Sequence, residues 1–324
     1  MSFTPSNFRQ IRQLFGFSIL KNTFVNKYCW TVNTKEMESL KTVKDLGYDF
    51  NAEGQLRKIG ADGLLTSEPF QFNVSDKHQE CQAHYEKLGD AITNYIYHLL
   101  ETQENLVRLT VPEGSSEGTF IFVSKDYDKK DVLMILINGS GAVRAGQWAR
   151  SLIINDCLDM GTQIPYIQKA QSKGYGVMVL NTNDNCLPNG KKIPHSSTAE
   201  EHARYIWDTY VGKANANSIV IVAHSYGGVV TLTLADQLKN KFDDRVKAIA
   251  FTDSVHSFSN IKMSKHFKEI SQNWISSSAA VDTPMNTPEF DCLRVSAGHP
   301  KHEMTSYACM DSVFKFIEDK LTKK

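Results

Sequence analysis

Short apolar runs alternate with amphipathic stretches along most of this chain. Residues 78–103 carry apolar side chains at three- and four-residue steps, which predicts an amphipathic helix that Asp76 is expected to cap. Further helices are predicted at Gln147 to Ile154, Ile164 to Lys173, 199–212, 227–240 and Ser306 to Leu321. β-branched and apolar runs predict strands at Leu106 to Val111, Thr119 to Val123, Val132 to Ile137, Gly176 to Leu180, Ser218 to His224, Arg245 to Phe251 and Cys292 to Val295.

Strands that alternate with helices indicate an α/β protein with a mostly parallel sheet and helices on both faces. We expect one domain over residues 39–322, preceded by a poorly ordered extension over residues 1–38. Within that domain, 55–58 and 69–72 are short strand candidates.

The composition narrows the classes of function. The net charge is zero and the isoelectric point is about 7.1, so no direct binding of nucleic acid is expected. No apolar run approaches the length needed to span a membrane. The six cysteines are scattered, without a Cys-x-x-Cys pair or a histidine at metal-ligand spacing. We therefore expect reduced thiols, no metal and no cofactor.

The first 35 residues contain no aspartate or glutamate but several lysines and arginines. Such a composition resembles a mitochondrial presequence. A disordered basic tail is the favoured alternative, because no amphipathic helix emerges from the pattern.

The strand predicted at Ser218 to His224 ends in Ser225, Tyr226, Gly227 and Gly228. A serine on a sharp turn between a strand and a helix is the geometry of a nucleophile elbow, with its hydroxyl held clear of the sheet. Ala223 occupies a position where that pattern usually has glycine. The alternative is a glycine-rich turn with an incidental serine.

A serine hydroxyl becomes a strong nucleophile only beside a base that a third group orients. The chain offers Ser225, Asp253 and His302, in the order nucleophile, acid, base that α/β-hydrolases follow. His299 is a rival base that the spacing does not exclude. His224 and His256 are expected to be structural, and Asp282 and Asp291 are fallback acids.

Acyl transfer also needs N–H donors for the developing oxyanion. Gly139, Ser140 and Gly141 follow a predicted strand, and Tyr226 follows the nucleophile, so their backbone N–H groups are candidates. Arg144 and Arg150 lie just beyond this loop. An arginine there could pair with an anionic group of a substrate or form a structural salt bridge.

Five segments together resemble the argonaute-binding (Arb-type) domain family, in particular its animal cotranscriptional regulators: Gly139 to Arg150, Val222 to Gly228, Phe251 to His256, Asn273 to Ser278, and Val295 to Gly298 with His302 and Glu303. The resemblance runs from about residue 43 to about 318 and implies an α/β-hydrolase-like fold. It places the family's serine on Ser225 and its His-Glu-x-Thr segment on His302 to Thr305, which favours His302 over His299. In this chain Asn138 stands where family members have histidine, and the charged insertion before residue 199 is nearly absent.

The resemblance implies a nuclear and cytoplasmic adaptor that is linked to argonaute, small-RNA-directed heterochromatin, splicing factors and chromatin. The residues themselves favour a second hypothesis, a serine hydrolase acting on a small ester or amide through Ser225, Asp253 and His302. A third reading, a mitochondrial hydrolase, rests only on the acid-free N-terminus.

Overall fold

The computed structural model describes residues 41–322. The predictions for residues 1–38, both the disordered extension and the presequence, lie outside this range. Among residues 41–322, none of the helices combines the length and the apolar composition of a membrane-spanning segment.

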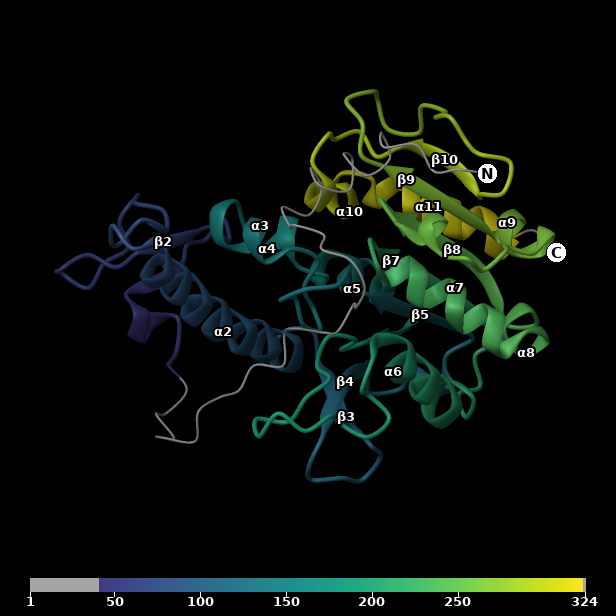
Figure 1. The fold of residues 1–324 in the computed structure, drawn as a ribbon, viewed down its shortest axis with the longest axis horizontal. Helices are drawn as coiled ribbons and strands as arrows, with labels where there is room; N and C mark the ends of the chain where they lie inside the picture. The colour runs from purple at the N-terminus through teal and green to yellow at the C-terminus, as the bar shows by residue number, and fades with distance from the viewer. Residues whose placement is uncertain (1–40, 323–324) are drawn as a thin grey trace.

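An eight-stranded sheet forms the centre of the molecule (Figure 1), with the order β10-β9-β8-β7-β5-β6-β4-β3. The pairs β3–β4 and β4–β6 are antiparallel and every other pair is parallel, so β4 runs opposite to the other seven strands of the sheet. The strands are β3 (Leu106–Val111), β4 (Thr119–Ser124), β5 (Val132–Ile137), β6 (Gly176–Val179), β7 (Ser218–His224), β8 (Val246–Thr252), β9 (Ser271–Ile275) and β10 (Leu293–Ser296). The predicted mostly parallel sheet is confirmed.

Helices cover both faces of the sheet because alternate side chains of each strand enter one of two apolar cores. One core is closed by α2 (His78–Thr102), α3 (Arg150–Asn155), α5 (Ile164–Ser172) and α11 (Met310–Thr322). The other is closed by α6 (Ala199–Ile206), α7 (Gly227–Leu238), α8 (Asn240–Asp243) and α9 (Lys265–Ile270). Two further short helices are α4 (Leu158–Gly161) and α10 (Thr305–Ala308).

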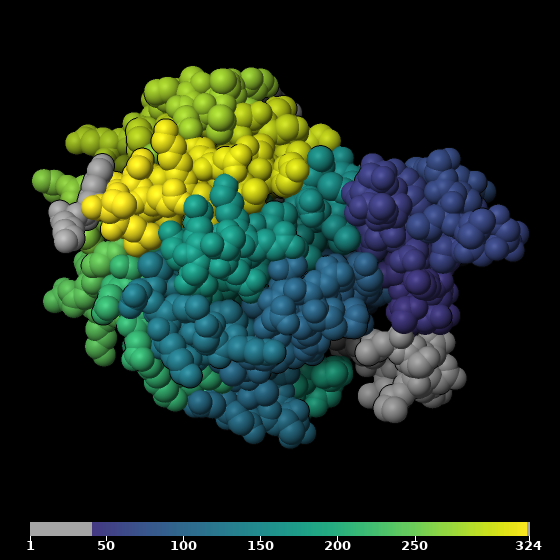
Figure 2. Space-filling model, turned by 180° about the vertical axis from the view of Figure 1, so that it is seen from behind, coloured from purple at the N-terminus to yellow at the C-terminus, as the bar shows by residue number. Residues whose placement is uncertain are grey.

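The N-terminal segment forms a separate two-stranded sheet of β1 (Tyr48–Phe50) and β2 (Leu56–Lys58). In Figure 2 this segment, coloured purple to blue, lies at one side of the molecule. Tyr48 and Leu56 are buried and join the core that α2 closes, so the segment packs onto that helix rather than onto the large sheet.

The chain connections place a switch point between β5 and β7. From β5 the chain crosses to β6 on one side, and it then returns to β7 on the other side of β5. Loops that leave the carboxyl ends of two such strands diverge and open a crevice between them, where ligands bind in open α/β sheets. The loop after β5 and the turn after β7 therefore frame the expected site.

Several predicted details are wrong. Helix α2 begins after Lys77, and no side chain caps it, so the predicted cap by Asp76 does not form. The helix predicted from Gln147 starts only at Arg150, because the preceding residues are extended around an isolated bridge between Gln147 and Thr162. Residues 69–72 form no strand. The strand β9 and the helix α9 were not predicted at all.

The expectation of reduced thiols is correct in part. Within residues 41–322, Cys81, Cys157, Cys292 and Cys309 are free. Cys186 is disulfide-bonded, so the expectation is wrong for that residue.

The central position of β5 predicts the effect of a cavity there. Leu136 of β5 is fully buried, whereas Leu64 is 67% exposed. We expect Leu136→Ala to lower the free energy of unfolding by about 2–5 kcal/mol, because the deletion leaves an unfilled space in the core. The matched Leu64→Ala change should stay within about 0.5 kcal/mol. Urea denaturation of both variants measures the difference, and equal effects would contradict the burial of Leu136 in the core.

Candidate active site

Ser225 sits on the turn between β7 and α7. Its backbone φ is +52°, a left-handed conformation that a non-glycine residue adopts only when its surroundings enforce it. A Cβ added to Gly227 would lie 2.7 Å from the carbonyl oxygen of Ile137, and one added to Gly228 would lie 1.7 Å from Oγ of Ser254. Both positions therefore require glycine, and the turn has the geometry of an α/β-hydrolase nucleophile elbow.

Asp253 and His302 lie in contact. Asp253 follows β8, and His302 begins a short 3-10 helix before α10. Nδ1 of His302 is 2.7 Å from Oδ2 of Asp253. Because a carboxylate only accepts, Nδ1 is the donor, and whenever the ring is neutral Nε2 offers the lone pair that can receive a proton.

A second hydrogen bond orients the acid. Oδ1 of Asp253 accepts the backbone N–H of Ser276 at 3.0 Å. Burial acts to raise the pKa of Asp253, but the hydrogen bond and charge of His302, together with Ser276, hold it below its ordinary value. Asp253 is therefore ionised near neutral pH and can stabilise an imidazolium at His302.

The backbone of Ser225 is joined to the segment that carries Asp253, but its hydroxyl does not bond to the pair: the N–H of Ser225 donates to the carbonyl of Thr252 at 3.1 Å. Among residues 41–322 no hydrogen bond joins Oγ of Ser225 to His302. The ring of His224, the residue before Ser225, packs against the His302 ring at 4.6 Å between centroids. Ligand-free sites often show a long contact between nucleophile and base that shortens when substrate binds.

The segment that carries His302 is fastened to the sheet. Oγ1 of Thr305 donates to the carbonyl oxygen of His302 at 2.8 Å, and Ser306 and Thr252 share a hydroxyl contact of 2.7 Å. Tyr166 of α5 donates to the carbonyl of Ser306 at 2.6 Å. These contacts place the imidazole at the carboxyl end of β8.

The rival residues have other partners. His299 accepts the backbone N–H of Lys301 at 3.1 Å. Asp282 accepts Nε1–H of Trp274 at 2.8 Å. Asp291 contacts His256 and Arg294 in a buried group. Within the described residues, Asp253 is the carboxylate that contacts His302.

The loop after β5 lies directly against the elbow. A Cβ on Gly139 would approach Cβ of Ser225 to 3.0 Å. Asn183 donates from Nδ2 to the carbonyl oxygens of Gly139 at 2.7 Å and Val143 at 3.0 Å. Arg150 donates to the carbonyl of Ala142 at 2.8 Å. The carbonyl groups of this loop are thus held by side chains.

The N–H groups of the same loop are left without protein acceptors. From Gly139 to Arg144, and also at Tyr226, no backbone N–H bonds to another group of the described chain. In a trans peptide the C=O and N–H point in opposite directions. Holding the carbonyl of Gly139 therefore fixes the direction of the Ser140 N–H and leaves it available for an oxyanion.

Asn138 has a structural part in this loop. It is 1% exposed, and its Nδ2 donates to the carbonyl of Gly139 at 3.0 Å, while its Oδ1 accepts from Thr182 at 3.3 Å. The sequence singled out Asn138, but it gave no role to Asn183 or to Ser276. The run of asparagines after β6 was the signal for Asn183, whereas Ser276 follows the unpredicted strand β9.

Two buried histidines support the site in their neutral form. His224 donates from Nδ1 to the carbonyl of Thr252 at 2.9 Å, and burial, aided by the charge of His302, lowers its pKa to about 3. His202 accepts the N–H of Asn181 at 3.2 Å, and burial lowers its pKa to about 3 as well. Asn181 in turn accepts the N–H of Ala145 at 3.0 Å, so His202 helps to hold the loop after β5.

His256, Asp291 and Cys292 are the group in the described range that could hold a metal ion, with candidate ligand atoms within 4.8 Å of one another. These atoms already satisfy each other. His256 bonds to Asp291 at 2.8 Å, the guanidinium of Arg294 contacts the other carboxylate oxygen, and burial raises the pKa of Cys292 to about 12. A neighbouring cation and a protonated thiol do not fit a metal site.

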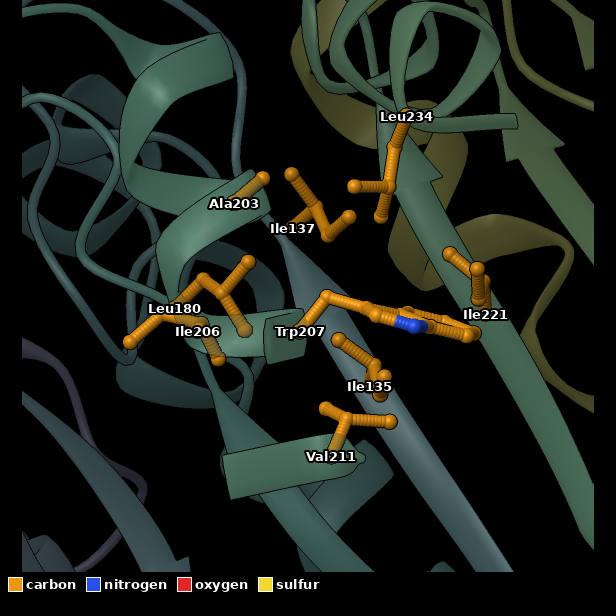
Figure 3. A pocket seen from close by; sticks show the side chains of 9 residues that line it. All are labelled: Ile135, Ile137, Leu180, Ala203, Ile206, Trp207, Val211, Ile221 and Leu234. Atoms are coloured by element: carbon orange, nitrogen blue, oxygen red, sulfur yellow. The ribbon is translucent and has the colours of Figure 1, made fainter. Parts of the chain in front are cut away.

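A small cavity lies between α6 and the sheet. Figure 3 shows side chains from β5, β7, α6 and α7 around it, and all nine of the lining residues are apolar. Such a space offers no group that could bind or activate a polar substrate, so it is a gap in packing rather than a reaction site.

Comparison with known proteins points to one family. The family model of the Arb2 domain matches residues 40–192 and 187–281. The cotranscriptional regulator ARB2A of Mus musculus is 38% identical over 339 residues, covering 86% of this chain and 80% of the relative. The Homo sapiens protein of that name is 38% identical over 338 residues, with the same shares of both chains.

Among solved structures, that of the histone deacetylase Clr3 matches with a TM-score of 0.51 and 16% identity. The match covers 80% of this chain and 42% of that one. This similarity concerns the fold alone.

The neutral histidines predict acid sensitivity. A folded-state pKa of about 3, below the unfolded value of 6.5, gives stability that is fully present above pH 6.5 and is lost as the pH falls toward 3. Each histidine should cost about 1.4 kcal/mol per pH unit in that window, or about 2 kcal/mol at pH 5.

The variant His202→Gln can accept from Asn181 without binding a proton. We expect it to be less stable at pH 7 but to lose about 2 kcal/mol less between pH 7 and pH 5 than the parent protein. Urea unfolding at pH 7 and at pH 5 measures the free energy of unfolding of both proteins. An equal loss between the two pH values in the variant and the parent would show that His202 is not held neutral.

Proposed function

The chain belongs to the Arb2 domain family, and from this premise we propose that it is a cotranscriptional regulator whose α/β-hydrolase-like domain, residues 39–322, retains a serine hydrolase site. The family membership and the 38% identity to the ARB2A proteins support the regulatory role. The contact between Asp253 and His302 beside a serine elbow supports the retained chemistry.

In the proposed reaction, Oγ of Ser225 attacks the carbonyl carbon of an ester or amide while Nε2 of His302 takes the hydroxyl proton. Asp253 orients the ring and stabilises the imidazolium. The N–H groups of the Gly139–Gly141 loop and of Tyr226 receive the oxyanion. The bond to the leaving group then breaks as His302 returns the proton to it, and water releases the acyl group from Ser225 by the same steps.

The regulatory role implies protein partners. We propose argonaute, chromatin or splicing factors as partners, a link to small-RNA-directed heterochromatin, and a nuclear location with a cytoplasmic share. No direct contact with nucleic acid is proposed, because the net charge of zero provides no attraction for phosphates.

A second candidate is a binding platform without catalysis. Ser225 is only 5% exposed, and its hydroxyl has no hydrogen bond to His302 among the described residues. In that case the contact between Asp253 and His302 serves to anchor the terminal segment on the sheet.

Labelling with a fluorophosphonate probe separates the two candidates. We expect the folded protein to be labelled, and Ser225→Ala to abolish the labelling because the probe needs the activated hydroxyl. Asp253→Asn should slow hydrolysis of a p-nitrophenyl ester by about 10³- to 10⁴-fold, since the imidazole loses its orienting carboxylate. Ser259→Ala is the matched control and should label like the parent. Unlabelled protein that unfolds cooperatively would favour the platform.

Capture of partners tests the regulatory role separately. Tagged protein should retain an argonaute from a nuclear extract, and Ser225→Ala should retain it with equal strength, because removing one recessed hydroxyl leaves the surface unchanged. Capture that fails with both proteins would count against the proposed argonaute link. Capture that fails only with Ser225→Ala would mean that binding depends on the site.

A further inference from the structure

Two arginines beside the oxyanion loop lack carboxylate partners. Arg108, Arg204 and Arg294 each form an ion pair with a nearby acid. Within residues 41–322, neither Arg144 nor Arg150 has a carboxylate within salt-bridge distance. The sequence allowed two roles for these arginines, a structural salt bridge or a contact with an anionic group of a substrate. In the described chain the salt bridge does not form.

Arg150 is held in a closely fitting site. The residue is 9% exposed, and a Cβ on Gly89 of α2 would lie 2.5 Å from its Nη1, so glycine at that helix position makes room for the guanidinium. Nη2 donates to the carbonyl of Ala142, while Nε is buried and has no hydrogen-bond partner. A buried cation with unused donors is costly unless an anion compensates it.

Arg144 adds a second positive charge at the same loop. Its Nη1 donates to the carbonyl of Val143 at 3.2 Å, and its charge lowers the pKa of Arg150 further after burial has lowered it. Tyr85, Glu86 and Asp90 act on this pair from α2, but none of these side chains lies within salt-bridge distance of either arginine in the described chain.

The loop between Ser225 and these arginines presents donors rather than acceptors. The N–H groups from Gly139 to Arg144 have no acceptor in the described chain, whereas the carbonyls of Gly139, Ala142 and Val143 are occupied. Ser140, Gly141 and Ala142 are exposed, so a ligand can reach this side of the loop. An oxyanion needs about two of these N–H donors. The N–H groups farther along the loop, toward Arg144, then remain free to bind a second group of the substrate.

We propose that Arg144, Arg150 and the distal N–H groups of this loop bind an anionic oxygen group of the substrate, so that the site prefers esters or amides that carry a carboxylate or phosphate near the reacting carbonyl. The inference rests on the proposed hydrolase function and specifies its substrate class. A planar guanidinium that can offer two parallel N–H groups suits either anion.

Paired substrates test the preference. Mono-p-nitrophenyl glutarate carries a free carboxylate, and its methyl ester is the neutral counterpart. We expect the full chain to give a kcat/KM at least tenfold higher for the acid, with the ratio falling as salt rises from 20 to 300 mM. Arg144→Gln should bring the ratio close to one. Arg150→Lys keeps the positive charge but loses the pair of parallel N–H donors, so it should give an intermediate ratio. Because the charge is kept, this variant also serves as the one expected to remain folded.

The matched control is Arg204→Gln, which removes a partly exposed arginine of α6 that pairs with Asp208. It should leave both rates and their ratio unchanged. Equal kcat/KM values for acid and methyl ester in the parent protein would overturn the inference while the hydrolase function stands. The inference is also overturned if Arg144→Gln leaves the ratio of kcat/KM for the acid to that for the methyl ester unchanged.

A binding measurement in a variant that cannot turn over substrate separates the proposed anion site from the proposed hydrolase function. Calorimetric titration of Ser225→Ala with glutarate or with inorganic phosphate should give binding that the added Arg144→Gln change weakens at least tenfold, and the stronger of the two ligands identifies the anion. If no ester is hydrolysed but this binding is observed, the anion site stands and the hydrolase function fails. If neither ligand binds, the anion site is overturned whatever the turnover.

Discussion

The arrangement of the site depends on how closely the backbone after β5 approaches the turn after β7. Gly227 lies so near the carbonyl of Ile137, and Gly139 so near Cβ of Ser225, that a larger residue at either position would force the two segments apart. Such contacts hold the loop after β5 and the turn after β7 in fixed positions relative to each other, because backbone atoms cannot move aside as a long side chain can. The nucleophile and the N–H donors take their places from this contact, whereas Arg150 is placed by the space that Gly89 of α2 leaves for it.

Much of the fold could be predicted because each central strand is buried on both faces. β5, β7 and β8 are mostly apolar, and their bounds are those of the predicted strands within a residue or two. β9 escaped prediction because Ser271, Gln272 and Asn273 are polar, and their burial depends on tertiary contacts with β8 and β10. The cap at Asp76 failed for a local reason, since the helix begins one residue after Lys77 and uses no side-chain acceptor.

The candidate site was predictable at the level of residue type and chain order, but not in its supporting contacts. An elbow serine, a strand-end aspartate and a late histidine can be recognised from spacing. The choice between His299 and His302 could not be made from loop geometry, and it follows in the structure from which ring faces Asp253. The two hydrogen bonds of Asn183 join segments about forty residues apart, so no local pattern could reveal them.

The position of the base within the chain has a further consequence. His302 precedes α11, whose Val313, Phe314 and Ile317 are buried in the same core as α2 and α5. A shortened product that stops before residue 300 would keep the serine elbow yet lack both the imidazole and one wall of its interior. A loss of activity in such a product could therefore come from unfolding of the domain as well as from the missing imidazole. The C-terminal segment both supplies the base and completes the core, and these two roles can be separated only by point substitution and never by deletion.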